Sequence, residues 1–175
     1  MHYVMTKARS RHDEEWERAR AAARLAACLA LYEMEFAGKG VEAVIADFRD
    51  NRFAEALPLE GDNGAPQTFD WGALDEDHFQ AVVRSAVRDQ SRIDEEIRGN
   101  LAKGWRFSRI DSTSRAILRA GVSELLDMPA IPAKAIIDSY VEIAKSFFDD
   151  ETPAFVNGVL DSVGSKARAA ELSRQ

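Results

Sequence analysis

The sequence holds a single cysteine, Cys28, among its 175 residues, so no disulfide can form within the chain. Cys28 lies between alanines and leucines on an apolar stretch, where we expect a buried structural thiol rather than a nucleophile. The longest apolar stretch, residues 21–34, is interrupted by Arg24 and Glu33 and is too short to cross a bilayer. The first thirteen residues are polar and contain no apolar signal core. These absences favour a cytoplasmic protein.

Catalytic and metal-binding motifs are also missing from the sequence. The three histidines, His2, His12 and His78, do not stand at metal-ligand spacing with one another or with the cysteine. Residues 38–40 (Gly-Lys-Gly) lack the residues that would have to follow in a phosphate-binding loop, and no G-x-S-x-G turn occurs. We therefore expect a protein that is not an enzyme and needs no metal or other cofactor.

Glycine and proline are scarce outside one segment, residues 58–72 (PLEGDNGAPQTFDWG). This segment holds two of the five prolines and three of the ten glycines without any period, which is typical of a loop. A loop of this length is unusual in a compact domain, so we expect it to be mobile. No alternating apolar pattern of strand length competes with helix elsewhere, and we expect no β-strand.

The sequence is rich in charge, with an excess of acid. Charged residues make up 30% of the chain and hydrophobic residues 46%, which is the range of a globular protein with a core of its own. The net charge of -7 argues against a protein that grips nucleic acid alone, because phosphate neutralisation needs a local excess of Lys and Arg. A basic patch on the acidic body, or a basic partner, is compatible with this charge.

Apolar residues recur at helical spacing along most of the chain. A first helix is predicted over residues 13–37, with two apolar stripes that would bury most of its sides, and Gly38 ends it. A short amphipathic helix follows at residues 41–48. After the glycine-rich segment, helical spacing continues over residues 79–101, as one long helix or as two in succession near Gln90.

The second half of the chain carries three further helix starts. Asp111 is a suitable N-cap, Pro132 suits a first helical position, and the Thr-Pro pair at 152–153 is a cap followed by a proline. The polar tail from Lys166 is expected to fray. We therefore predict an all-α fold, a single compact bundle of about seven helices that forms one domain over residues 1–175.

Two pairs of arginines and one phenylalanine stand out on these helices. Arg20 and Arg24 are four residues apart and so emerge on one side of the first helix, as Arg115 and Arg119 do on a later one. From spacing alone, the better interpretation of the first helix is that Arg18 and Arg20 form exposed salt bridges with Glu14 and Glu17. For Arg115 and Arg119 the alternative is a solvated face or pairing with nearby carboxylates. Phe155 opens the last helix, where spacing alone favours an ordinary core phenylalanine.

Three segments, taken in order, resemble the NusB family. Residues 20–35 look like the arginine-led first helix of the family, which ends in Leu-Tyr. Residues 115–134 are similar to its central helix and the Ile-Pro-x-Lys turn that follows. Residues 141–161 contain V-E-I-A-K-S-F and then F-V-N-G-V-L-D, a string that is hard to obtain by chance. The likeness spans the chain apart from the first dozen residues, the 58–72 segment and the tail.

The resemblance implies an RNA-binding transcription factor. Members of the family bind the boxA element of nascent RNA together with NusE, a small-subunit ribosomal protein. The complex helps RNA polymerase to read through terminators, notably in ribosomal RNA operons. For this chain we therefore expect three partners, boxA RNA, NusE and the antitermination complex of RNA polymerase, and no membrane.

The family likeness also moves several residues toward a binding role. An aromatic ring at a helix start can stack on an unpaired base, and the free backbone N–H groups there suit a phosphate. We assign the contact with a protein partner to the start of one helix, at Asp111, Ser114 and Arg115. The expected RNA-binding residues are Arg20, Arg24, Tyr32, Arg119, Lys145, Phe155 and Asn157.

Two of these assignments keep an alternative, and one glycine near them needs an explanation. Tyr32 is favoured as a core residue with its hydroxyl at the rim, and RNA contact is its second interpretation. Asn157 suits a base edge and a tie to the preceding loop equally well. Gly158 costs roughly 1 kcal/mol relative to alanine inside a helix, and a close helix–helix approach would explain why it is tolerated.

The likeness to the family weakens in front of the first helix. Four of residues 13–17 are acidic, where the family is usually basic, so RNA binding by the isolated chain should be weak. We expect RNA binding to depend on NusE, which would add basic surface while this acidic body docks it. The alternative function is a helical protein-interaction module with the family fold and little RNA affinity. The sequence leaves the oligomeric state open, a homodimer included.

Overall fold

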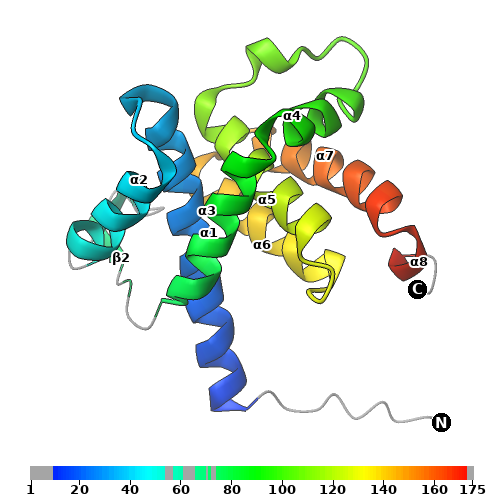
Figure 1. Ribbon diagram of the computed structural model, residues 1–175. Coiled ribbons are helices and arrows are strands. Elements are labelled where there is room, and N and C mark those ends of the chain that lie inside the picture. Colours follow the sequence, from blue (N-terminus) through cyan, green and yellow to red (C-terminus); the bar gives the residue numbers. More distant parts are fainter. Residues whose placement is uncertain (1–9, 54–56, 61–65, 70, 72–73, 173–175) are drawn as a thin grey trace, which may run out of the picture.

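Helices make up most of the computed structural model, which describes residues 10–53, 57–60, 66–69, 71 and 74–172. The α-helices are α1 (Arg11–Ala37), α2 (Val41–Asp47), α3 (Glu76–Arg88), α4 (Gln90–Gly99), α5 (Ser112–Asp127), α6 (Ala133–Phe147), α7 (Thr152–Ala167) and α8 (Ala169–Leu172) (Figure 1). A π-helical turn (Phe48–Arg52) extends α2, and a 3₁₀ turn (Phe107–Arg109) precedes α5. The expected helical bundle is confirmed, with one addition in the glycine-rich segment.

That addition is a two-stranded antiparallel sheet. Strand β1 (Leu57–Glu60) pairs with β2 (Pro66–Phe69), so the expectation of a strandless loop is wrong for these residues. Each strand contains a proline, which donates no hydrogen bond, and the pattern is too short for alternation to reveal it. The sequence also predicts that residues 58–72 are mobile. Residues 61–65, 70 and 72 of this segment lie outside the described residues.

The central element of the bundle is α5. It packs against α1, α3, α4, α6 and α7, so both its faces are buried (Figure 1). The close approach of α7 depends on Gly121, because a Cβ there would lie 3.0 Å from Cδ2 of Leu160. Gly158 meets nothing within 4 Å, so the expected close contact at that glycine is wrong and belongs to Gly121 instead.

Helix boundaries follow local capping chemistry. Helix α1 begins two residues earlier than expected because Ser10 and Asp13 form a reciprocal capping box, and it ends at Gly38, whose φ is +62°. Asp89 separates α3 from α4, which confirms two helices in succession. Pro132 is the N-cap of α6 rather than its first residue.

The polar tail from Lys166, for which fraying is predicted, is helical in this structure through most of its residues to 172. The Arg168 guanidinium is buried and donates hydrogen bonds to the carbonyl oxygens of Leu125 (2.8 Å), Met128 (2.8 Å) and Ile131 (3.0 Å). These carbonyls lie at the end of α5 and just beyond it, where helical partners run out. The tail is therefore tied to the central helix by one arginine that sequence periodicity gave no reason to single out.

Candidate RNA-binding and partner-binding surfaces

A buried polar cluster connects α1 to the central helix. Nε and Nη2 of Arg24 donate hydrogen bonds to the Glu124 carboxylate at 2.9 and 3.0 Å, and the Tyr140 hydroxyl donates to the same carboxylate. Nε2 of His78 lies 3.0 Å from Oε1 of Glu124. Because a carboxylate only accepts, this ring nitrogen carries a proton. The cluster ties α1, α3, α5 and α6 together beneath the surface.

Arg24 was expected to contact RNA, and the structure contradicts this. Its exposed fraction is 6%, and its guanidinium is satisfied by Glu124 from α5. Arg20 and Arg24 do share one side of α1, but that side turns into the core between them. The carboxylate that neutralises Arg24 lies one hundred residues away in sequence, so no local pattern could reveal it.

Glu124 in this cluster stays ionised near neutral pH, and Tyr140 stays neutral. Burial alone would raise the pKa of the Glu124 carboxyl, but hydrogen bonds from His78 and Arg24 outweigh burial and lower it to about 2. Burial and the neighbouring Glu124 charge raise the pKa of Tyr140 well above its usual 10, and the same two causes raise that of Cys28. Cys28 is thus the buried, inert thiol that the sequence predicts.

Arg20 lies at the edge of a groove between α1 and α6. Its guanidinium stacks over the Trp16 ring at 4.4 Å and lies 3.6 Å from Asp75 just before α3. The groove has a volume of about 1220 Å³, and carboxylates such as Asp138 and Glu142 line it on the α6 side. A cation and acids therefore share this groove.

Lys145 and Asn157 lie together in a second, smaller hollow between the end of α6 and the start of α7. Its walls include Asp149 and Asp150 as well. Lys145 pairs with Glu142 at 3.0 Å, and Glu142 also lines the first groove, so the outer side of α6 connects the two hollows. Arg20 thus lines one hollow, Lys145 and Asn157 line the other, and the Lys145–Glu142 ion pair lies between the two.

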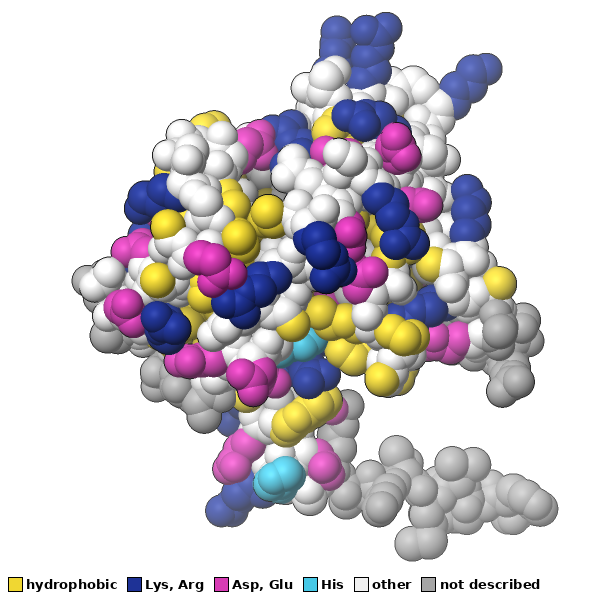
Figure 2. Space-filling view, viewed as in Figure 1, with side chains coloured by type: hydrophobic (Ala, Val, Ile, Leu, Met, Phe, Trp, Pro, Cys, Tyr) yellow, Lys and Arg dark blue, Asp and Glu magenta, His cyan; other side chains and the backbone are white. Residues whose placement is uncertain are grey.

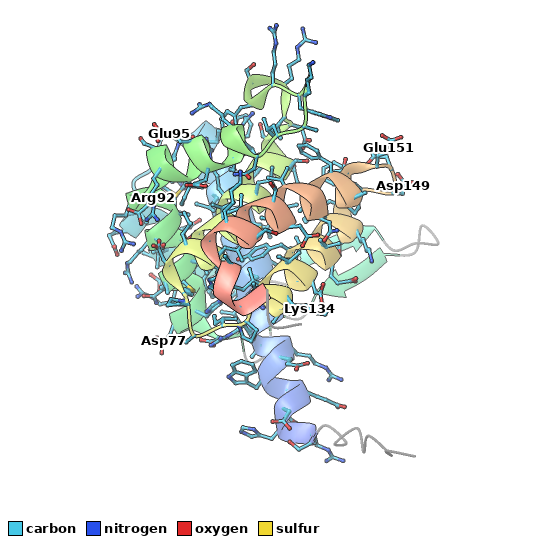
Figure 3. All side chains as sticks on the ribbon, turned by 90° about the vertical axis from the view of Figure 1, so that its right-hand side faces the viewer. Asp77, Arg92, Glu95, Lys134, Asp149 and Glu151 are labelled. Carbon is cyan, nitrogen blue, oxygen red and sulfur yellow. The ribbon has the colours of Figure 1, made fainter. Side chains whose placement is uncertain are left out.

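The start of α7 is already occupied by an acid of this chain. The Asp150 carboxylate accepts a hydrogen bond from the Thr152 backbone N–H at 2.8 Å, and the bonds to Thr152 lower the pKa of Asp150. Asp149 and Glu151 lie at the same edge of the molecule (Figure 3). The Thr152 N–H is therefore already bonded, and the neighbouring carboxylates oppose a phosphate at this helix start.

Phe155 is half-buried, and its ring has an aromatic partner. It stacks on Trp105, with the ring centroids 4.6 Å apart and the planes tilted by 26°. Trp105 belongs to the segment between α4 and α5 and is 52% exposed. Sequence reasoning missed Trp105, although aromatic and basic residues alternate around it in K-G-W-R-F-S-R.

Arg115 and Arg119 are held by carboxylates of α1 and α4. Arg119 binds Asp94 on α4 with two hydrogen bonds of 2.8 and 3.0 Å. Glu35 on α1 lies 3.5 Å from Arg119 and forms a salt bridge with Arg115. Salt bridging is the alternative that spacing favoured, although the partners come from other helices. Arg119 is therefore partly exposed, and its charge is neutralised by Asp94 and Glu35.

The other two residues assigned to a protein partner build the start of α5. The Asp111 carboxylate accepts hydrogen bonds from the Ser114 backbone N–H (3.0 Å) and hydroxyl (2.6 Å), which confirms Asp111 as the N-cap. Ser114 is buried. Both side chains are thus used within the chain, and Arg115 is the member of this set that reaches toward α1.

Tyr32 and Phe36 form an exposed aromatic pair near the end of α1. They are 40% and 65% exposed, and their ring centroids lie 5.1 Å apart. The favoured interpretation of Tyr32 as a core residue is therefore wrong. Because Glu35 lies between the two in sequence and bonds Arg115, the pair adjoins the start of α5.

The described part of the chain shows neither a membrane-spanning helix nor a cluster of metal ligands. No helix there is both long and apolar enough to cross a membrane. No three His, Cys, Asp or Glu side chains of the described residues group as ligands for a metal ion.

Comparisons with known proteins agree with the fold. Residues 21–165 match the sequence model of the NusB family. The transcription antitermination protein NusB of Caulobacter vibrioides is 44% identical over 149 residues, which are 85% of this chain and 94% of that protein.

Solved structures show the same architecture. T. maritima NusB superposes with a TM-score of 0.68 at 25% identity, over 88% of this chain and 96% of that one. A chain in a crystal structure of the antitermination factors NusB and NusE with double-stranded RNA superposes with a TM-score of 0.64. It is 23% identical and covers 85% of this chain and 98% of its own.

Proposed function

The chain belongs to the NusB family, and on this basis we propose that the protein is a transcription antitermination factor. It binds boxA RNA together with NusE, as part of the antitermination complex of RNA polymerase, and supports transcription of ribosomal RNA operons. The observation that carries this proposal is the 44% identity to an antitermination protein along nearly its whole length. The role is one of binding rather than catalysis, and it places the protein in the cytoplasm with the polymerase, as one RNA-binding domain over its length.

The geometry supports a smaller RNA-binding set than the sequence suggested. Arg20, Lys145 and Asn157 line the two hollows beside α6. Phe155 lies in the first turn of α7, two residues before Asn157. We retain these four residues as RNA contacts. Arg24 is removed from the set because it is buried, and Arg119 contributes little because Asp94 and Glu35 neutralise it.

The exposed aromatic pair supports a docking surface for NusE. Aromatic residues that remain exposed are favoured at the centre of protein interfaces. Tyr32 and Phe36 fulfil this condition, and Arg115 adjoins them through Glu35. We therefore move Tyr32 from the RNA-binding set to the partner surface, together with Phe36 and Arg115.

Charge supports the dependence of RNA binding on the partner. The chain has a net charge of -7, and carboxylates line both hollows beside α6. Like charges repel the phosphate backbone, so the isolated chain binds RNA weakly at physiological salt. A basic partner docked on the acidic body supplies the missing positive charge.

The test is a titration of fluorescein-labelled boxA RNA with the protein, with and without NusE, at a stated salt concentration. A scrambled RNA of the same length and composition is the control. We expect NusE to tighten binding and boxA to bind more tightly than the scrambled RNA. Equal affinity for both RNAs in the presence of NusE would refute an antitermination role, and tight binding without NusE would refute the dependence on the partner.

The burial of Arg24 and the neutralisation of Arg119 also favour one second candidate, a protein-interaction module of this fold with little RNA affinity. The double variant Arg20→Ala/Phe155→Ala separates the two functions in the same titration. Unchanged affinity for boxA RNA would favour the interaction module, whereas a clear loss supports RNA binding at the surface beside α6.

A further inference from the structure

The last two residues of α4 and the segment that follows them form the most basic part of this acidic chain. From Arg98 through Ile110 it carries four cations, Arg98, Lys103, Arg106 and Arg109, and no carboxylate. All four are exposed, and none forms a salt bridge with a carboxylate that the structure describes. The segment projects from the top of the molecule in Figure 1, and Figure 2 shows Lys and Arg side chains gathered on this projection.

An exposed tryptophan lies among these cations. One side of the Trp105 ring is covered by Phe155, at 4.6 Å between centroids, yet 52% of the residue remains exposed. The stack beneath it fixes the plane of the indole, so the other face is open to solvent. An exposed aromatic face surrounded by cations is a suitable stacking surface for a nucleic-acid base.

The segment is held in place at several points. The Asn100 side-chain oxygen accepts hydrogen bonds from Ser162 (2.7 Å) and Lys166 (2.8 Å) on α7. The Arg98 guanidinium lies 4.4 Å over the Phe107 ring, and Arg115 donates to the Ile110 carbonyl at 2.6 Å. Little ordering would therefore be needed when a ligand binds here.

We propose that Trp105 is a stacking platform for an unpaired base of single-stranded RNA and that Lys103, Arg106 and Arg109 contact its phosphates. Proteins hold single strands by combining aromatic faces with cations along the backbone, and both occur here within seven residues. The inference rests on the proposed RNA-binding function and extends the RNA surface past Phe155. None of these four residues belongs to the set expected from the sequence.

Stacking on tryptophan tolerates any base, and this property makes the inference separable from boxA recognition. In the fluorescein-RNA titration with NusE present, Trp105→Ala should weaken binding of boxA and scrambled RNA by the same factor, about tenfold. Trp105→Phe keeps a ring and should restore most of the affinity. The triple variant Lys103→Gln/Arg106→Gln/Arg109→Gln should reduce the slope of log affinity against log salt by about 2.

Arg92→Gln is the matched control for the lost cations. Arg92 is an exposed arginine on α4 that forms no salt bridge with any residue that the structure describes. It lies at the opposite edge of the molecule from Asp149 and Glu151, which flank the start of α7 (Figure 3). Its substitution should leave both the affinity and the salt slope unchanged. Thermal unfolding of each variant checks that the fold is retained.

Two outcomes would overturn the inference. The first is wild-type RNA affinity of Trp105→Ala in a folded variant. The second is a Trp105→Ala variant that loses affinity for NusE in calorimetry without RNA but binds RNA as the wild type does when NusE is absent. That result would make the segment a contact for the protein partner. If wild-type protein does not distinguish boxA from scrambled RNA but Trp105→Ala weakens both, the antitermination function fails and the stacking platform stands.

Discussion

At the scale of single residues, Glu124 has the largest consequences. Its carboxylate is fully buried and accepts hydrogen bonds from Arg24, Tyr140 and His78. Glu124→Gln leaves the Arg24 charge buried without its counter-charge, so we expect the free energy of unfolding to fall by about 3–5 kcal/mol at pH 7. Urea unfolding measures this change. Glu142→Gln, which removes an exposed carboxylate on α6, is the control and should change stability by less than about 0.5 kcal/mol.

The same carboxylate predicts how stability depends on pH. Its pKa is about 2 in the folded protein against a usual 4.5. A lowered folded-state pKa contributes stability that is fully present above about pH 4.5 and is lost as the pH falls toward 2. Wild-type protein should therefore lose more stability between pH 5 and pH 3 than Glu124→Gln does, where pH 5 and pH 3 are about the ends of this window. Parallel urea midpoints for the two proteins across that window would contradict the assignment.

Two features of the candidate site could not be predicted from the sequence, the burial of Arg24 and the exposure of Trp105. The spacing of Arg20 and Arg24 correctly gives one side of α1, but it cannot say that α5 supplies a carboxylate to the second arginine. Burial of a charge is decided by a partner that is distant in sequence. Trp105 was missed for a related reason, because its exposure depends on the stack with Phe155 fifty residues later.

At the scale of elements, we expect substitution by alanine to have opposite effects at Gly121 in α5 and Gly158 in α7. A Cβ at Gly121 would lie 3.0 Å from Leu160 and 3.3 Å from Tyr140, so Gly121→Ala should destabilise the protein by about 1–3 kcal/mol through overpacking. At Gly158 a Cβ meets nothing within 4 Å, so Gly158→Ala should stabilise α7 by about 0.5–1 kcal/mol. Thermal unfolding of both variants measures the difference, and equal shifts would contradict the packing of α5 against α7.

The helices could be predicted from the sequence because their determinants are local. Apolar spacing gives each buried face, Asp111 caps α5 as expected, and the chain breaks at Asp89 near the expected position. The hairpin and the docked tail could not be predicted in this way. The strands pair with each other rather than follow a pattern, and Arg168 stabilises the tail by bonding carbonyls of residues 125–131.

At the scale of the whole molecule, α1 connects two surfaces with different tasks. Trp16 and Arg20 lie toward its beginning, beside the groove with α6, and Tyr32 and Phe36 lie toward its end, beside α5. Trp16 and Tyr32 are separated by about 24 Å along the helix axis at the rise of an α-helix. If RNA and NusE bind at the two surfaces proposed above, they do not compete for one face of the helix.

This division of surfaces predicts that partner binding can be removed alone. Because exposed aromatic residues dominate interface energies, Tyr32→Ala/Phe36→Ala should weaken NusE binding about tenfold or more in calorimetry without RNA. Trp16→Ala removes an equally exposed ring from the same helix and should leave NusE affinity unchanged. RNA binding by the double variant without NusE should match the wild type, and the tightening that NusE causes should disappear. If Trp16→Ala weakens NusE binding as much as the double variant does, the partner covers the whole of α1 and RNA must bind elsewhere.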